Sequence, residues 1–403
     1  MRRNCIAILG KQDTPTDAVE EYCRYLGEAM QAEDYDLKIE RVPWVEHGWG
    51  AAVRKLRRRA KEWKGTWVLV QYTALAWSAR GFPIRFARVL KTLKAAGARV
   101  AVVYHDAEPY GGTRVIDRLR RRVQLRTMRK ALRVSEVAVF TVPPERLSWP
   151  KTSDSRTLFI PVGANLPTSE AASRKNISTD EKLSIAVFGI TGGDAGKKEV
   201  ENIAEAVRFA ASQMGNLRLI VLGRNSESFE GQLKASLNGS AVELHVLGLL
   251  SSEDVVRTLC VSEVLLFVRG HISTRRGSAI AGIACGLPIV AFEGTETSPP
   301  ITEAGLALYS PQRKADLGDV LVRVLKDEQY RTSLAQRSWL AHAQYFSWRA
   351  IAARYVEFMN EAIEAKLCRI GIRQNHKSQR HKASIRTSFF FSASLVSASR
   401  DAK

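Results

Sequence analysis

Cysteine is scarce in this 403-residue chain, and its five copies are scattered. No Cys-x-x-C pair occurs, so the sequence offers neither a disulfide framework nor the ligand spacing of a zinc site. Cys5, Cys260 and Cys285 lie in or beside apolar runs, where a thiol packs as a small hydrophobe. We therefore expect a reducing compartment and a cytoplasmic location.

Long apolar runs are also missing. No stretch approaches the roughly 20 apolar residues that a membrane-spanning helix requires. The run from Cys5 to Leu9 is too short for a signal peptide and leads into polar residues. We expect a soluble protein, or one that is peripheral at the inner face of the cell membrane.

Negative charge is in short supply. The chain has 61 Lys and Arg residues against 41 Asp and Glu, which gives a formal net charge of +20. Such an excess indicates an anionic partner, which could be nucleic acid, an anionic bilayer surface or a phosphorylated substrate. No recognised nucleic-acid-binding module accompanies the charge, so nucleic acid is the least favoured of these partners.

Apolar runs alternate with helical periods along the first half of the chain, a pattern typical of a parallel, doubly wound sheet. The expected strands are Cys5–Leu9, Leu37–Val42, Trp67–Gln71, Arg99–Tyr104, Val137–Thr141 and Leu158–Pro161. The expected helices are Asp17–Gln31, Trp49–Trp63, Pro83–Ala95 and Arg114–Leu132.

The same pattern restarts after residues 168–182, which are rich in Ser, Thr, Ala and Lys and are expected to form a linker. The later strands are Ser184–Phe188, Leu217–Leu222, Glu243–Leu247, Val264–Val268, Pro288–Ala291 and Leu306–Tyr309. The later helices are Glu199–Met214, Phe229–Leu237, Ser252–Val261, Gly277–Cys285, Lys314–Lys326, Asp327–His342 and Trp348–Leu367.

This pattern predicts an α/β chain of two Rossmann-like domains, residues 1–167 and 183–345, which face each other across a cleft. A closing helix in 346–367 is expected to pack back on the first domain. The basic segment 368–403 lacks clear periodicity and is expected to be disordered.

One segment, from Gly270 to Ala291, is especially informative. A buried strand runs into a loop with Gly, Ser and Arg residues, and the loop opens a helix of small residues. Small residues let a ligand approach the backbone, and the free N–H groups of a helix N-terminus favour phosphate. The alternative is an ordinary strand–helix–strand unit with a close-packed helix.

The end of that segment, Ala284-Cys285-Gly286-Leu287-Pro288-Ile289-Val290-Ala291, resembles the Ala-Cys-Gly-x-Pro-Val block of the GT-B fold glycosyltransferases of the group 1 or family 4 class. The order and spacing of further blocks extend the resemblance from Ile6 to Met359. These blocks are Phe188-Gly189, Val221-Leu222-Gly223, Leu247-Gly248, Phe346-Ser347-Trp348, His105-Asp106 and Ile160–Asn165.

The resemblance implies a GT-B fold and a hexosyltransferase that takes a sugar from a nucleotide-sugar donor. The implied acceptor is a glycan or a lipid-linked molecule, in polysaccharide or glycolipid biosynthesis. The class retains the configuration of the sugar and works without a bound metal or another cofactor. No Asp-x-Asp metal motif stands out here.

The chain departs from this class at two positions. The class usually carries two glutamates eight positions apart, and the corresponding residues here are Ser273 and Ala281. The second glutamate normally binds the donor ribose, which an alanine cannot do. The Ser-x-Arg-Arg-Gly form resembles a subgroup of bacterial transferases with the same replacement. Either that subgroup binds its donor differently, or this chain is a non-catalytic GT-B-like binding protein.

The candidate ligands of the donor are residues at strand ends and helix starts, where cations and N–H groups can stabilise a departing diphosphate. They are Gly192, Gly193, Lys197, Lys198, Arg224, Ser273, Arg275, Arg276, Gly277 and Ser278. Lys197 is preferred over Lys198, both being placed just before a helix. Arg224 could instead be a surface arginine, and Ser278 could instead cap its helix.

The candidate catalytic residue is His105, which ends a buried strand and is expected from the resemblance to contact the transferred sugar. Asp106 either orients His105 or begins a turn. Gly10 and Asp13 lie on the first strand–helix loop and are expected on the acceptor side, whereas Asp17 is expected to cap a helix.

Two expected helices are strongly basic. The helix expected at Trp49–Trp63 and the helix expected at Arg114–Leu132 both carry rows of arginines and lysines. The second also has interleaved apolar residues, which suits either an anionic membrane surface or a solvated helix with an apolar face toward the core.

Overall fold

The computed structural model describes residues 2–150, 156–167, 182–310 and 316–361. The chain divides into two compact units, Met1–Ala353 and Arg354–Lys403, and the first unit contains both sheets. The linker expected at 168–182, apart from its last residue, the end of the closing helix beyond residue 361 and the whole tail 368–403 lie outside the described residues.

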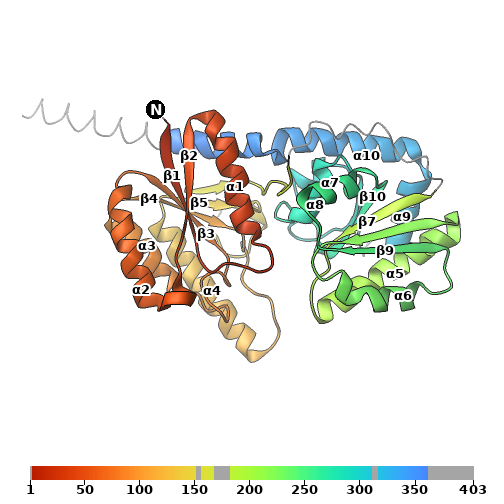
Figure 1. Cartoon of the computed structure of the whole chain (residues 1–403), viewed down its shortest axis with the longest axis horizontal. Helices are drawn as coiled ribbons and strands as arrows, with labels where there is room; N and C mark the ends of the chain where they lie inside the picture. Colours follow the sequence, from red (N-terminus) through yellow and green to blue (C-terminus); the bar gives the residue numbers. More distant parts are fainter. Residues whose placement is uncertain (1, 151–155, 168–181, 311–315, 362–403) are drawn as a thin grey trace, which may run out of the picture. The chain divides into compact units, whose positions relative to one another are not determined.

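The first sheet has six parallel strands in the order β2-β1-β3-β4-β5-β6 (Figure 1). The strands are β1 (Arg3–Leu9), β2 (Tyr35–Arg41), β3 (Trp67–Tyr72), β4 (Arg99–Tyr104), β5 (Val137–Phe140) and β6 (Thr157–Phe159). The order reverses between β1 and β3. Right-handed crossovers therefore place α1 (Ala18–Met30) on one face, and α2 (Trp44–Arg59), α3 (Phe86–Ala95) and α4 (Val115–Val134) on the other.

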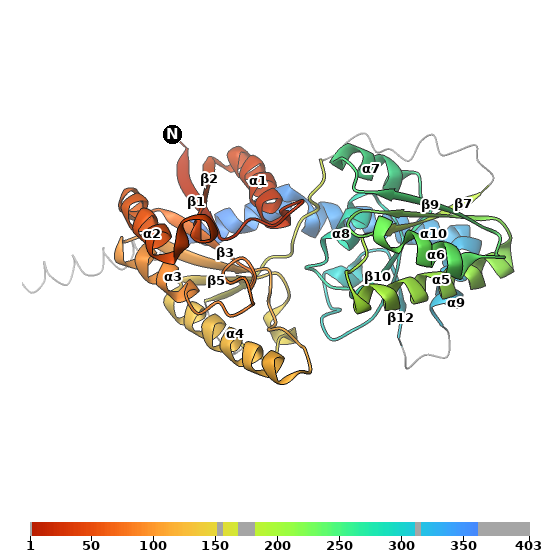
Figure 2. The ribbon, with the colours of Figure 1, turned by 60° about the horizontal axis from the view of Figure 1, so that its bottom comes forward.

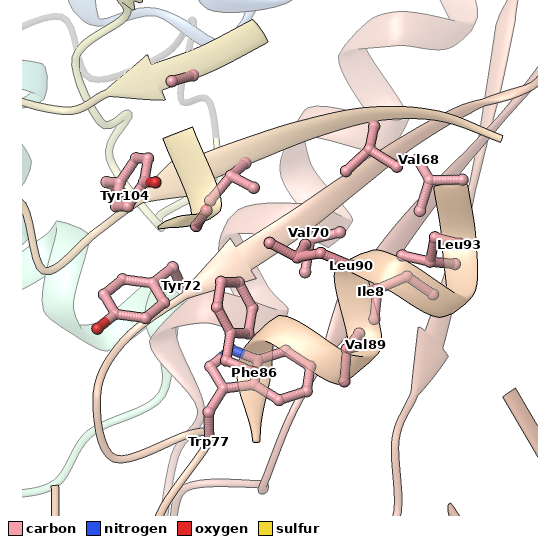
Figure 3. Packing of buried hydrophobic residues seen from close by; sticks show 14 of the residues in the cluster. Ile8, Val68, Val70, Tyr72, Trp77, Phe86, Val89, Leu90, Leu93 and Tyr104 are labelled. Carbon is pink, nitrogen blue, oxygen red and sulfur yellow. The ribbon is translucent and has the colours of Figure 1, made fainter. Parts of the chain in front are cut away.

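The core of this domain lies between the sheet and α3 (Figure 3). Strands β3 and β4 are buried along their whole length, as expected for the centre of a parallel sheet. Helix α3 presents Phe86, Val89, Leu90 and Leu93 at helical spacing to this sheet. Trp77 is fully buried beside Phe86, and its indole N–H is satisfied by Gln71 O at 2.8 Å.

The second sheet repeats this plan, in the order β12-β11-β10-β7-β8-β9 (Figure 2). Its strands are β7 (Leu183–Phe188), β8 (Leu217–Leu222), β9 (Val242–Gly248), β10 (Val264–His271), β11 (Ile289–Phe292) and β12 (Leu306–Tyr309). The helices are α5 (Asp194–Met214), α6 (Glu230–Leu237), α7 (Ser252–Cys260), α8 (Gly277–Ala284), α9 (Leu317–Lys326) and α10 (Glu328–Ala341). The order reverses between β7 and β10.

Each of the twelve strands expected from the sequence has a counterpart, and the expected α/β class with two Rossmann-like sheets is confirmed. A further helix runs from residue 348 to 361. Its first residue, Trp348, stacks on Tyr25 of α1 and donates from its indole N–H to Ala164 O at 2.6 Å.

Several expected boundaries were wrong. Helix α2 begins at Trp44 rather than Trp49. Helix α5 begins at Asp194 rather than Glu199, because Gly196 lies in its first turn and not in a flexible loop. A Cβ at Gly196 would come within 1.9 Å of Thr191 O, so close packing requires this glycine. Strand β10 continues to His271 rather than ending at Val268, through an irregularity in its pairing with β11 that includes Gly270 in a left-handed conformation.

None of the helices in the described part of the chain is long and apolar enough to cross a membrane. The four described cysteines form no disulfide with one another, and burial raises the pKa of Cys5 to about 12.

Candidate functional site

A pocket of about 330 Å³ opens where the strand order of the first sheet reverses. Its walls come from the loops that follow β1, β3 and β4, including Gly10, Asp13, Gln71 and Asp106. In doubly wound sheets such a reversal point separates the adjacent strand-end loops and leaves a ligand-sized crevice. Gly10 is needed there, because a Cβ at this position would come within 2.2 Å of Ala76 O.

His105 extends from the end of β4 and is held by a side chain that the sequence analysis did not single out. Its Nε2 lies 2.8 Å from Gln71 Oε1, and its ring lies edge-on to Tyr22, with 4.9 Å between the ring centroids. Burial lowers the pKa of His105 to about 4, against a smaller opposing effect of Asp17. His105 is therefore a neutral imidazole at pH 7, with the hydrogen on Nε2 and a lone pair on Nδ1.

Asp106 holds the neighbouring loop and not the histidine. Its Oδ2 accepts a hydrogen bond of 2.7 Å from the backbone N–H of Ala74. Burial raises the pKa of this carboxyl group, although the Ala74 hydrogen bond and Arg275 partly offset the effect. Asp106 therefore holds the loop after β3, a role that the sequence analysis did not anticipate.

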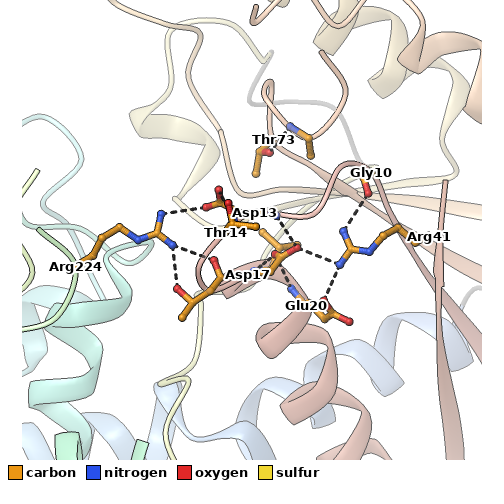
Figure 4. A network of polar contacts seen from close by, with 11 residues as sticks. Gly10, Asp13, Thr14, Asp17, Glu20, Arg41, Thr73 and Arg224 are labelled. Carbon is orange, nitrogen blue, oxygen red and sulfur yellow. Dashed lines mark hydrogen bonds and ion pairs between the residues drawn. The ribbon is translucent and has the colours of Figure 1, made fainter. Parts of the chain in front are cut away.

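Asp13 and Arg224, one expected at the acceptor and the other at the donor, bind each other. Arg224 NH1 lies 3.2 Å from Asp13 Oδ2, and NH2 donates to both oxygens of Thr16 at 2.9 Å (Figure 4). The first loop is fixed from the other side by Arg41, which contacts Asp17 at 3.1 Å and Glu20 at 2.7 Å.

Asp17 caps α1 as expected, because its Oδ1 accepts from Val19 N and Glu20 N, each at 3.1 Å.

Arginines gather at the reversal point of the second sheet, between β7 and β10. Arg269, which the sequence analysis missed, has a buried Nε with no hydrogen-bond partner among the described residues. Burial lowers its pKa, and Glu199 opposes this. Glu199 already accepts a hydrogen bond of 2.8 Å from Thr191 N. Its position could have indicated this role, because Arg269 lies near the carboxyl end of β10, one of the two strands between which the strand order reverses.

Arg276 lies beside Arg269 and is the N-cap residue of α8. Its Nε donates to His271 O at 3.3 Å, and no ion pair of this side chain occurs among the described residues. Burial, followed by the nearby Arg275 and the weaker effect of Arg269, lowers the pKa of Arg276 to about 10. Arg269 and Arg276 therefore form a pair of cations whose charge the surrounding side chains compensate poorly.

Arg275 differs from Arg276, because a carboxylate already binds it. Its Nε and NH2 contact the two oxygens of Glu296 at 2.7 and 2.9 Å. Burial tends to raise the pKa of Glu296, but Arg275 and Ser273 lower it more. Ser273 is fully buried beside this pair. Glu296 escaped the sequence analysis because it lies 21 residues after Arg275.

The predicted lysines, Lys197 and Lys198, are the fourth and fifth residues of α5, and both are exposed. Lys197 Nζ is 3.1 Å from Asp194 Oδ1, an exposed pair within the helix. The N-cap is Gly193, in a left-handed conformation. Cations are unfavourable at the positive end of a helix, so two lysines there favour a negatively charged ligand nearby.

Gly277 and Ser278 begin α8. A Cβ at Gly277 would meet nothing within 4 Å, so this backbone faces open space. The N-cap of α8 is Arg276, which makes no side-chain capping hydrogen bond, and Ser278 is the second residue of the helix and not its cap. Among the described residues, no group of three or more His, Cys, Asp or Glu side chains could hold a metal ion.

No family model and no curated protein matches the sequence of this chain. Solved structures do match its fold. Anabaena HepE in complex with UDP and glucose is 13% identical with a TM-score of 0.62, covering 89% of this chain and 100% of that one. Sucrose-phosphate synthase from Thermosynechococcus elongatus is 18% identical with a TM-score of 0.64, covering 90% and 100%.

A protein assigned as a UDP-N-acetylglucosamine 2-epimerase from Listeria monocytogenes is similar as well. It is 11% identical with a TM-score of 0.59, and the match covers 91% of this chain and 98% of that one. At these identities the likeness concerns the fold alone. The chain has the GT-B fold, with two sheets of the kind found in glycosyltransferases.

Proposed function

We propose that this chain is a glycosyltransferase that moves a sugar from a nucleotide-sugar donor to a glycan or lipid-linked acceptor. It acts in the assembly of polysaccharide or glycolipid, in the cytoplasm or at the inner face of the membrane. The reaction retains the configuration of the sugar and requires no bound metal.

The observation that carries this proposal is the pair Arg269 and Arg276 at the reversal point of the second sheet. Both guanidinium groups have lowered pKa values, and neither has an ion pair among the described residues. A diphosphate bound there would receive both cations and the free N–H groups of α8. These are the groups that stabilise a departing nucleoside diphosphate without proton transfer from an acid.

The reaction itself then needs little else from the protein. The bond between the anomeric carbon and the diphosphate oxygen breaks, and the acceptor oxygen forms its bond on the same face. The acceptor proton passes to the leaving phosphate oxygen, so no separate general base is required. The neutral imidazole of His105 supports sugar binding, because its Nδ1 lone pair can accept a hydrogen bond from a hydroxyl group.

A specific observation favours the alternative, a GT-B-like protein that binds a nucleotide sugar without transferring it. Ala281 is 2% exposed within α8, so position 281 offers no polar group to a ribose. The fold leaves other chemistry open as well, since an epimerase assignment occurs among proteins with this fold.

The first experiment measures the thermal stability of the full chain with UDP, GDP, ADP and TDP at fixed salt. UDP leads the series because the similar HepE structure contains it. A nucleotide at about 100 times its Kd stabilises the fold by roughly 2.7 kcal/mol. We expect one nucleotide to raise the Tm, and Arg269→Gln and Arg276→Gln each to abolish the rise.

Lys326→Gln is the matched control, because it removes an exposed cation at the end of α9 and should keep the full shift. A shift that survives in both arginine variants would contradict this placement of the diphosphate. Release of UDP from the matching nucleotide sugar separates transfer or hydrolysis from binding alone. Tight binding without any release would favour the non-catalytic alternative.

A further inference from the structure

A second concave surface lies on the first domain, away from the strand ends. It is a groove of about 720 Å³ between α2 and α3, which lie side by side in Figures 1 and 2. Its rim carries five cations and its lining includes no acidic residue. The cations are Arg54, Arg57, Lys61, Arg88 and Lys91. We call this surface the α2–α3 groove.

The cations of the groove lack partners that their neighbours have. Just outside it, Arg59 pairs with Glu40, and Lys94 lies 3.4 Å from Glu136. Within the described residues, none of the five groove cations makes an ion pair or a side-chain hydrogen bond. Arg59 and Lys94 beside the groove are thus compensated, whereas the five cations in it are not, which favours an anionic occupant.

The floor of the groove indicates that this occupant also has an apolar part. The lining includes Trp49 and Val53 of α2, and Ala95 and Ala96 at the end of α3. Trp49 is half-buried and stacks on Trp44, with 5.1 Å between the ring centroids. Tryptophan is enriched at membrane interfaces, where its ring lies between polar headgroups and apolar chains.

The same layer of helices exposes further apolar side chains. Val115, Ile116 and Leu119 at the start of α4 are 75%, 47% and 50% exposed, and Ile84 before α3 is 65% exposed. Arg114, Arg118 and Arg122 accompany them, all exposed. Apolar side chains among cations are typical of surfaces that bind anionic bilayers.

We propose that the α2–α3 groove binds the phosphate-bearing headgroup of an anionic membrane lipid. The phosphate lies among the rim cations, and the adjoining glycerol and acyl carbons lie on the floor formed by Trp49 and Val53. The lipid is a ligand of the first domain, so this binding does not depend on a nucleotide sugar or on sugar transfer.

Co-flotation of the full chain with vesicles tests the proposal. We expect binding to vesicles of phosphatidylglycerol and phosphatidylcholine, and much weaker binding to phosphatidylcholine alone. Each cation near an anionic surface contributes about fivefold in affinity. The triple variant Arg54→Gln, Arg57→Gln, Lys91→Gln should therefore bind the phosphatidylglycerol vesicles with an affinity at least tenfold lower.

The matched control removes the same charge from α4, in the triple variant Arg126→Gln, Arg129→Gln, Lys130→Gln. These side chains are exposed and, within the described residues, make no ion pair. If the groove holds a headgroup, the α2–α3 variant should lose much more vesicle affinity than the α4 variant. Equal losses would mean diffuse attraction to the bilayer and would overturn the proposal. Both variants keep the basic C-terminal segment, so its contribution cancels.

Ala95 allows a second test that changes a single exposed position of the floor. Ala95→Glu and Ala95→Gln differ only in charge, and glutamate and glutamine have similar helix propensities. We expect Ala95→Glu to weaken vesicle binding several-fold relative to Ala95→Gln. Indistinguishable binding of these two variants would count against an anion in the groove.

Soluble anions separate the lipid from other occupants. Millimolar pyrophosphate should release the chain from the vesicles more than chloride of the same ionic strength does, because it competes for the rim cations. Equal release by the two salts would mean diffuse attraction and would overturn the proposal. Preferential binding to single-stranded RNA, lost in the same triple variant, would overturn it too. Release by pyrophosphate together with a preference for the vesicles over the RNA supports the lipid.

Discussion

His105 Nε2 lies 2.8 Å from Gln71 Oε1, so an uncharged amide, and not a carboxylate, holds the imidazole at the end of β4. Gln71 also donates from its amide nitrogen to Leu69 O at 3.3 Å, which leaves its oxygen facing His105. An amide does not stabilise the imidazolium form as a carboxylate would. This pairing and the burial of the ring keep His105 neutral.

The lowered pKa of His105 predicts a dependence of stability on pH. Between about pH 6.5 and pH 4 the unfolded chain binds a proton that native His105 does not, so this residue destabilises the fold as the pH falls. The full effect is at most about 3 kcal/mol. We expect His105→Gln to remove this part of the acid sensitivity, measured by denaturant unfolding at several pH values. The same pH slope in both proteins would contradict a neutral, buried His105.

Gln71→Glu should reverse the electrostatics of the same pair. A carboxylate at about 2.8 Å favours the imidazolium ion and should raise the pKa of His105 by one unit or more. NMR titration of the histidine ring protons measures the change. Gln71→Leu is the comparison, since it removes the hydrogen bond without adding charge. A pKa that stays near 4 in Gln71→Glu would show that burial alone controls this residue.

Glu296→Gln tests the pair that engages Arg275. The glutamine keeps the shape of the side chain but replaces two charge-assisted hydrogen bonds, of 2.7 and 2.9 Å, in a partly buried site. We expect a loss of about 2 kcal/mol in the free energy of unfolding. Glu303→Gln, at an exposed carboxylate, is the control and should change stability little. Equal stability of the two variants would mean that the pair contributes nothing net.

Two glycines at the ends of α8 should respond differently to alanine. Gly286 has a φ of +66°, and a Cβ there would come within 2.1 Å of Trp339 Nε1. We expect Gly286→Ala to cost about 3 kcal/mol in unfolding experiments. Gly277→Ala meets open space and should leave stability within about 1 kcal/mol, while weakening the nucleotide-induced shift in Tm. A full nucleotide shift in Gly277→Ala would argue against a diphosphate at this backbone.

Much of the architecture could be predicted from local patterns. Apolar strands such as Arg99–Tyr104 are buried on both faces, so their composition alone marks the centre of a parallel sheet. Asp17 could be assigned as a helix cap, because capping depends on residues two and three positions away. Both predictions rest on contacts that are short in sequence.

The candidate sites were less predictable, because their contacts join distant segments. The hydrogen bond between Gln71 and His105 joins residues 34 positions apart, and the one between Arg275 and Glu296 joins residues 21 positions apart. Arg269 is brought beside Arg276 by the irregular end of β10, which no period in the sequence signals. Lys197 and Lys198 were placed before a helix that in fact contains them, since Gly196 was interpreted as loop although close packing requires it in the first turn.

The sequence by itself determined that this chain folds as two α/β sheets with an excess of positive charge, because period, turn residues and net charge are local or additive properties. The tertiary structure alone decided which cations remain without partners. Arg275 is neutralised by Glu296, whereas Arg269, Arg276 and the rim of the α2–α3 groove are not, within the described residues. Charge compensation depends on distances between segments remote in sequence, and those distances exist only in the folded chain.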